Sequence, residues 1–221
     1  MSKILIISDL HLGSVYAREK LLLDMLNTVE YDEVILAGDV IDFIKVPHFT
    51  PTTLLIIEKL CQYPVTYVYG NHDIAFEKFA DKHLRNIFFC DRHEFVVANR
   101  KFVVEHGHKY ESGILRTRLL MNFIGVMGDI IERIFNFNMN FVHDFFLTRK
   151  KRIQRIWNII DKNKSADVFI MGHTHNPEVL IWVDKDERIR TYVNTGDWVE
   201  NATYVIIDAE GQLRLRNYLK S

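Results

Sequence analysis

Five short apolar runs along this chain each end in a side chain that can bind a metal ion. The runs are rich in Val, Ile and Leu, a pattern typical of strands that are buried on both faces of a sheet. In open α/β sheets, ligands gather at the carboxyl ends of such strands. The donors that follow the five runs are, in chain order, Asp9 and His11, Asp39, Asn71 and His72, His106, and His173 and His175. We therefore expect oxygen and nitrogen donors from distant parts of the sequence to meet at one sheet edge.

The spacing of the other segments predicts an α/β core. Residues 17–30, 51–63 and 74–84 carry apolar side chains at helical spacing, and their alternation with the apolar runs predicts parallel strands joined by crossover helices. Residues 86–105 and 179–219 instead hold short β-type runs separated by charged or glycine-containing turns. The sum predicts a mixed sheet, or two packed sheets, with helices outside.

Residues 109–164 interrupt this pattern between the fourth and fifth runs. From Ile114 to Leu147 the segment is apolar on more than one helical face, so it must be buried, pair with a partner or meet lipid. A basic cluster, Arg149–Arg155, follows it. We expect a core of residues 1–108 and 165–221 and a helical cap of residues 109–164. Whether the cap shelters a lipid, or packs on protein with the basic cluster solvated, stays open.

The donor set favours two divalent metal ions. It combines carboxylate, imidazole and amide groups and contains no cysteine, a mixture that several first-row ions accept. Gly38, Gly70 and Gly172 each stand directly before a donor, and a glycine at position 38, after a buried strand, lets the backbone turn sharply. Any one of these motifs alone could be structural. Two cations ~3.5–4 Å apart would hold both the attacking and the leaving oxygen of a displacement at phosphorus.

Taken in order, the motifs D-x-H, G-D-x-x-D, G-N-H-D, a strand-end His and G-H-x-H resemble those of the calcineurin-like metallophosphoesterase family. The resemblance spans Asp9 to His175 and implies a four-layer α-β-β-α sandwich with a dinuclear centre. Mn²⁺ is the metal expected first, with Fe or Zn²⁺ as alternatives. The resemblance further implies that one metal is held by Asp9, His11, Asp39 and His175, and that Asp39 bridges to a second metal completed by Asn71, His106 and His173.

His72 would then lie over the phosphoryl group, where it could stabilise the transition state or protonate the leaving oxygen. Asp42 and Asp73 could orient imidazoles, or each could instead have a simple helix-cap or turn role. His108 could face the phosphate or have no catalytic part. Residues 194–198 either border the site or form a hairpin turn.

Within the family, the cap makes the chain resemble the UDP-2,3-diacylglucosamine diphosphatase group. This resemblance implies hydrolysis of the diphosphate to UMP and a lipid sugar phosphate, a step of lipid A synthesis, with Arg116, Arg118 and His108 as substrate contacts. One departure counts against it, because well-known members of that group have Arg where this chain has His72. A second hypothesis therefore stays open, a hydrolase of the same chemistry that acts on another nucleotide-linked or soluble phosphodiester. A third is a non-catalytic scaffold, against which the full ligand set argues.

Charge and hydropathy limit the kinds of partner that this chain is expected to bind. The chain has 28 Lys and Arg against 29 Asp and Glu, so its formal net charge of −1 gives no general attraction to nucleic acid, which is not an expected partner. No segment offers the ~20 uninterrupted apolar residues of a membrane-spanning helix. We expect a cytoplasmic protein whose Arg149–Arg155 cluster can rest on anionic lipid at the inner face of the membrane. The sequence leaves the oligomeric state open.

Overall fold

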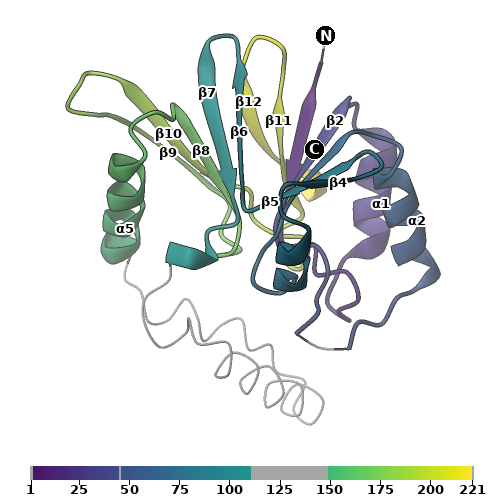
Figure 1. The fold of residues 1–221 in the computed structure, drawn as a ribbon. Helices are drawn as coiled ribbons and strands as arrows, with labels where there is room; N and C mark the ends of the chain where they lie inside the picture. Colours follow the sequence, from purple (N-terminus) through teal and green to yellow (C-terminus); the bar gives the residue numbers. More distant parts are fainter. Residues whose placement is uncertain (1, 45, 111–148, 221) are drawn as a thin grey trace. The chain divides into compact units, whose positions relative to one another are not determined.

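The structure, a computed structural model, describes residues 2–44, 46–110 and 149–220 (Figure 1). The chain divides into two compact units, residues 1–108 with 165–221 and residues 109–164. The first unit holds both sheets. Helix α5 (Arg149–Lys162) is the main described element of the second. Residues 111–148 of the predicted cap, which include Arg116 and Arg118, lie outside the described residues, and the cap stays a prediction.

A seven-stranded sheet forms one half of the first unit, in the order β12-β11-β1-β2-β3-β5-β4. Strands β1, β2, β3 and β5 run parallel to one another, whereas β11, β12 and β4 are antiparallel to their neighbours. The strands are β1 (Ile4–Ile7), β2 (Glu33–Ala37), β3 (Val65–Val68), β4 (Lys82–Leu84), β5 (Ile87–Cys90), β11 (Thr203–Ile207) and β12 (Leu213–Asn217). The carboxyl ends of β1, β2 and β3 therefore share one edge.

A five-stranded sheet, in the order β6-β7-β8-β10-β9, forms the other half. Strands β7, β8 and β10 are parallel, so their carboxyl ends also share an edge. The strands are β6 (Arg92–Val97), β7 (Arg100–Glu105), β8 (Val168–Met171), β9 (Glu178–Val183) and β10 (Ile189–Asn194). Because β10 and the next strand, β11, belong to different sheets, the hairpin-turn alternative for residues 194–198 is wrong. That segment is a crossover between the sheets.

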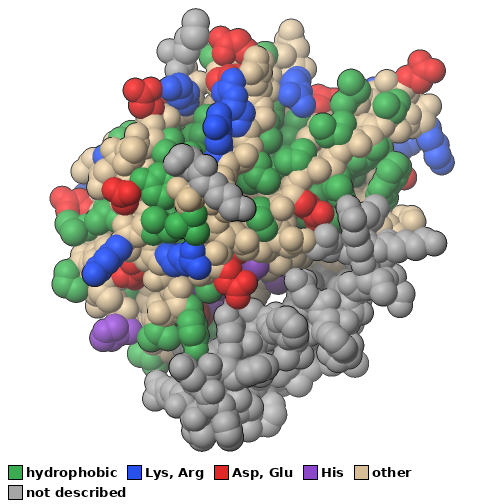
Figure 2. All heavy atoms as spheres, turned by 180° about the vertical axis from the view of Figure 1, so that it is seen from behind, with side chains coloured by type: hydrophobic (Ala, Val, Ile, Leu, Met, Phe, Trp, Pro, Cys, Tyr) green, Lys and Arg blue, Asp and Glu red, His purple; other side chains and the backbone are tan. Residues whose placement is uncertain are grey.

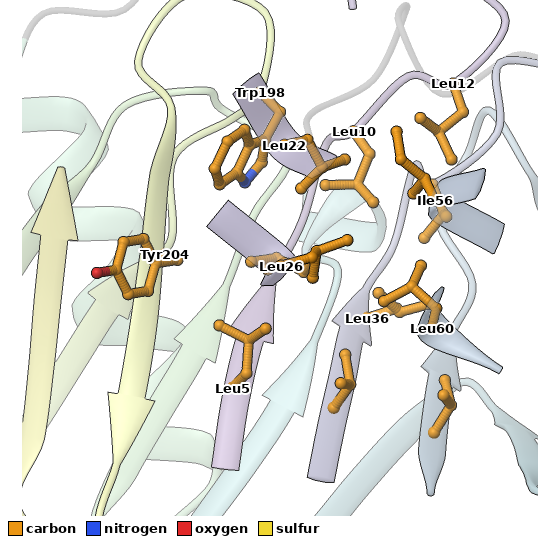
Figure 3. Close-up of a cluster of buried hydrophobic side chains, with 14 of the residues drawn as sticks. Leu5, Leu10, Leu12, Leu22, Leu26, Leu36, Ile56, Leu60, Trp198 and Tyr204 are labelled. Atoms are coloured by element: carbon orange, nitrogen blue, oxygen red, sulfur yellow. The ribbon is translucent and has the colours of Figure 1, made fainter. Parts of the chain in front are cut away.

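Two apolar layers hold this unit together. Between the sheets, Ile6 and Ile35 of the first belong to one buried cluster with Phe102 and Ile170 of the second. On the opposite face of the seven-stranded sheet lie helices α1 (Glu19–Thr28) and α2 (Pro51–Leu60). Figure 3 shows buried side chains of these two helices over Leu5 and Leu36. The alternation of Leu5 and Ile6 between the two layers is the period-2 pattern of a strand covered on both faces.

These observations confirm the predicted α/β sandwich of two sheets flanked by helices. The helix predicted over residues 74–84 is wrong, because the segment forms a short 3-10 helix, Ile74–Phe79, and then strand β4. The Asp73 carboxylate does not cap a helix here, since it binds elsewhere in the fold, and Lys82–Leu84 pair with β5 at the sheet edge. None of the described helices is long and apolar enough to cross a membrane.

Candidate metal centre

All seven expected metal ligands, together with His72, follow the carboxyl ends of five strands. Strands β1, β2 and β3 of the first sheet lead to Asp9 and His11, to Asp39, and to Asn71 and His72. Strands β7 and β8 of the second sheet lead to His106, and to His173 and His175. The structure brings their donor atoms together in overlapping groups, so side chains up to 166 positions apart in the sequence (Asp9 and His175) converge. Their roles as ligands stay predictions.

The backbone at this convergence is left-handed at several non-glycine residues. Asp9 and Asp39 have φ of 52°, His11 46°, His173 68° and His175 53°. A residue with a Cβ adopts this conformation at a cost of about 1–3 kcal/mol, and such residues cluster at functional sites. All five lie two to four residues beyond the end of a strand, in the turns whose side chains form the groups of donors. No sequence signal identified this feature.

The glycines before the donors allow one strand end to lie directly against the donor of another. A Cβ on Gly38 would overlap the His106 ring, and one on Gly70 would lie 2.6 Å from the Asp39 nitrogen. A Cβ on Gly172 would overlap the side chains of Ser8 and Asp9. The predicted reason for Gly38 was the sharp turn alone, whereas the structure adds this close approach across strands at all three glycines.

The first group of donors consists of Asp9, His11 and His175. The His175 Nε2 atom lies 3.3 Å from Asp9 Oδ1 and 3.2 Å from His11 Nε2. Asp9 is completely buried, yet its Oδ1 atom accepts no hydrogen bond from the described residues. In the metal-free chain this oxygen faces only the imidazoles of His175 and His11 among the described residues, and a bound cation would satisfy it directly.

The second group consists of Asp39, Asn71, His106 and His173. The His106 Nε2 atom lies 3.1 Å from Asp39 Oδ2 and 3.2 Å from Asn71 Oδ1. His106 Nδ1 donates to the Ala37 carbonyl at 2.9 Å, which leaves Nε2 for a ligand and fixes the orientation of the ring. Asp39, His106 and His173 offer ligand atoms within 4.8 Å of one another. Asp39 also joins a group with His11 and His72, so it lies between the two sets of donors.

His72 is held beside Asp39. Its backbone N–H donates to Asp39 Oδ1 at 2.8 Å, and its Nε2 atom lies 3.8 Å from Asp39 Oδ2. On the other side of the ring, Nδ1 lies 2.9 Å from the buried carboxylate of Asp42. Asp42 therefore orients an imidazole, one of the two alternatives that its motif left open.

Asp73 and His108 have different surroundings. The Asp73 carboxylate accepts hydrogen bonds from Val40 N at 2.8 Å, Tyr67 Oη at 2.6 Å and Gly70 N. It fastens the turn after β3 to the turn after β2, and within the described part of the chain it neither orients an imidazole nor caps a helix. The His108 ring centre lies 5.5 Å from that of His106 and 6.3 Å from that of His173, so His108 borders the second group.

Electrostatics divides the histidines into two kinds. Burial lowers the pKa of His106, but the charge and hydrogen bond of Asp39 outweigh it and raise the pKa to about 10. In the same way, burial is outweighed at His175 by Asp9, and its pKa rises to about 9. Burial, with the charges of His72 and His175, lowers the pKa of His11 to about 4. The metal-free centre thus holds protons on two of its expected ligands at neutral pH.

Comparison with known proteins shows the family and agrees with the fold. Residues 2–212 match the model of the calcineurin-like phosphoesterase superfamily domain. Among solved structures, the chain is similar to Vps29 of Chaetomium thermophilum, with 11% identity, a TM-score of 0.55, and coverage of 98% of this chain and 96% of that one. It is also similar to a dimetal phosphatase of Danio rerio, with 13% identity, a TM-score of 0.53, and coverage of 98% of this chain and 96% of that one. A third similar structure is an archaeal phosphodiesterase, with 17% identity, a TM-score of 0.51, and coverage of 97% of this chain and 99% of that one.

At these identities the structural likeness shows a shared fold. A search of curated proteins finds no significant match.

Metal binding should release protons and should tighten as the pH rises. Ligand imidazoles must be neutral, whereas His106 and His175 have pKa values of about 10 and about 9 without metal. At pH values below those pKa values, the affinity for metal should rise about tenfold per pH unit for each proton that binding releases. Titration calorimetry with Mn²⁺ in buffers of different ionisation enthalpy measures how many protons the protein releases when the metal binds. Heats that do not depend on the buffer would contradict the assigned protonation.

Proposed function

The chain belongs to the calcineurin-like phosphoesterase superfamily and is a metal-dependent phosphoesterase, and from this premise we propose that it hydrolyses a diphosphate or phosphodiester at the centre around Asp39. The observation that carries the proposal is the place of Asp39 between two groups of donors. One carboxylate within reach of both groups is the arrangement that a pair of bridged cations requires. The bond attacked is a phosphorus–oxygen bond, which water cleaves by displacement at phosphorus.

The donors present fit two divalent ions. Asp9, His11, Asp39 and His175 would hold one, and Asp39, Asn71, His106 and His173 the other. When bound, the ions would neutralise the phosphate charge and lower the pKa of water, so that a nucleophile is available at neutral pH. The carboxylate and amide oxygens in both sets suit Mn²⁺, and the imidazoles extend the choice to Fe and Zn²⁺.

His72 is proposed to donate a proton to the oxygen of the leaving group. The contact of Nδ1 with the Asp42 carboxylate places a proton on Nδ1 and directs Nε2 toward Asp39. Burial lowers the pKa of His72, but the charges of Asp39 and Asp42 outweigh it, so the pKa is raised and the ring can carry its second proton. Asp42 then acts through His72, since it fixes the ring that meets the substrate.

For the substrate we propose UDP-2,3-diacylglucosamine, cleaved to UMP and a lipid sugar phosphate. The family resemblance and the apolar segment 114–147 support this choice. So do the loops after β1 and β2, which carry exposed apolar side chains beside the ligand strands, with Val15 85% and Val46 94% exposed. Arg116, Arg118 and His108 are the proposed substrate contacts, and the Arg149–Arg155 cluster is the proposed contact with anionic lipid.

A different phosphodiester substrate is the second candidate, and His72 is the observation that favours it. The diphosphatase group has Arg at that position, whereas His is usual in the wider family. Nucleic acid is the less suitable soluble substrate, because basic and acidic side chains are interspersed over the face shown in Figure 2 and the formal net charge is −1. A nucleotide or a cyclic nucleotide meets no such objection.

A turnover assay with Mn²⁺ should separate the two substrates. We expect release of UMP from UDP-2,3-diacylglucosamine to exceed cleavage of cyclic nucleotides and dinucleotides at equal concentration. The reason is that the exposed apolar loops and the cap would add binding energy only for the acylated substrate. Good cleavage of a soluble ester with none of the lipid would overturn the substrate proposal and leave the chemistry standing.

Replacing His72 should lower kcat most when the substrate has a poor leaving group. We expect His72→Ala to lower kcat by about 10²–10⁴-fold for an alkyl phosphodiester, which needs the proton, and far less for a nitrophenyl ester. Asp42→Asn should show the same pattern more weakly. The exposed His83, on β4, gives the matched control His83→Ala. Equal losses for both leaving groups would mean that His72 does not protonate the leaving oxygen.

A further inference from the structure

The crossover loop between β10 and β11 is bonded to both segments that carry the first group of donors. Trp198 N donates to the Asp9 carbonyl at 3.0 Å, and Asn201 Nδ2 donates to the His175 carbonyl at 2.8 Å. Asn194 Nδ2 donates to the Gly172 carbonyl at 2.7 Å, just before His173. Asn194 and Thr195 are fully buried, so their polar groups have no solvent to satisfy them. The loop is therefore built around the donor segments.

Two hydroxyl groups connect this loop to the Asp9 side chain. The Oγ1 atom of Thr195 lies 2.6 Å from Ser8 Oγ, and Ser8 Oγ in turn bonds to Asp9 Oδ2. An ionised carboxylate only accepts, so Ser8 donates its one proton to Asp9. The Gly196 carbonyl also lies 3.1 Å from Ser8 Oγ, but the Asp9 carboxylate is the closer acceptor and it is charged. Ser8 then has only lone pairs to offer to Thr195, so Thr195 donates to Ser8 at 2.6 Å and not to the Met171 carbonyl, which is 3.3 Å away. The result is a directed chain from Thr195 through Ser8 to Asp9.

This chain distinguishes the two oxygens of Asp9. Oδ2 accepts from Ser8 and from His173 N at 2.9 Å, whereas Oδ1 accepts from none of the described residues. Oδ1 faces His175 Nε2 at 3.3 Å, inside the first group of donors. A carboxylate held through one oxygen presents the other in a fixed direction, which is how groups behind a ligand tune a metal site.

We propose that Thr195 and Ser8 are positioning residues that hold Asp9 for the metal of the first group. The inference rests on the proposed dinuclear centre, and it adds that the affinity of one of the two ions depends on a hydroxyl group of the crossover loop. The Thr195 hydroxyl also lies 3.3 Å from the Met171 carbonyl, but the loop is held there without it, because Thr203 Oγ1 donates to the Thr195 carbonyl at 2.7 Å and Thr195 N donates to the Met171 carbonyl at 2.9 Å.

Substitutions of Thr195 separate the hydroxyl group from the shape of the side chain. Thr195→Val keeps the shape and removes the donor, whereas Thr195→Ser keeps the donor. Thr191→Val is the matched control. Thr191 is buried like Thr195, but it lies within β10 and outside this hydrogen-bond chain. Mn²⁺ isotherms, electron paramagnetic resonance of the bound ions and thermal unfolding without metal would be recorded for each protein.

We expect two bound ions in the unsubstituted chain and in Thr191→Val. In Thr195→Val one of the two should bind about 10–100-fold more weakly, and Thr195→Ser should restore it. At limiting metal, Thr195→Val should then show isolated Mn²⁺ where the unsubstituted chain shows a spin-coupled pair. Unchanged binding in Thr195→Val, or equal losses in the Val and Ser variants, would overturn the inference but not the proposed function.

Failure of the unsubstituted chain to bind Mn²⁺, Fe or Zn²⁺ would overturn both the inference and the proposed function. If Thr195→Val does not fold, Ser8→Ala asks the same question by removing a single oxygen next to Asp9. Weakening of one ion would then support the inference, and unchanged binding of both would overturn it.

Discussion

The Asp39 carboxylate is buried where the edges of the two sheets meet, and its contacts set how those edges are arranged. It receives the His72 backbone N–H at 2.8 Å from the first sheet and faces His106 Nε2 at 3.1 Å from the second. A buried carboxylate is costly unless charged or hydrogen-bonded partners surround it. His106 can approach only because Gly38 and Gly70 have no side chains. The residues that form the centre are therefore also residues that pack the two sheets against each other.

The donors near Asp39 are held in conformations that the chain would avoid elsewhere. Left-handed backbone at Asp9, His11 and Asp39 costs stability, and surrounding hydrogen bonds must over-determine it. The crossover loop supplies one of those bonds, from Trp198 N to the Asp9 carbonyl, and the Asp73 carboxylate ties the turns after β2 and β3 together. These groups are not expected ligands, yet each one fixes where an expected ligand points. Preorganisation of this kind lets a site bind cations without rearranging.

Much of the fold was predictable because each buried strand carries a continuous apolar run and ends on a polar donor. The order of those donors along the chain was enough to predict that they meet, and the structure does bring Asp9 together with His11 and His175, and Asp39 together with His106 and His173. The helix predicted over residues 74–84 failed because edge pairing with β5 overrides helical spacing. The links from Thr195 to Asp9 could not be predicted, since they depend on which sheet receives β11, and local sequence does not carry that information.

The central claim is that Asp39 is shared by two metal ions, and anomalous diffraction from crystals of the Mn²⁺-loaded protein tests it most directly. The account predicts two anomalous peaks ~3.5–4 Å apart, both in contact with the Asp39 carboxylate. One peak should also contact Asp9, His11 and His175, and the other Asn71, His106 and His173. A single peak, or two peaks of which only one contacts Asp39, would contradict the account.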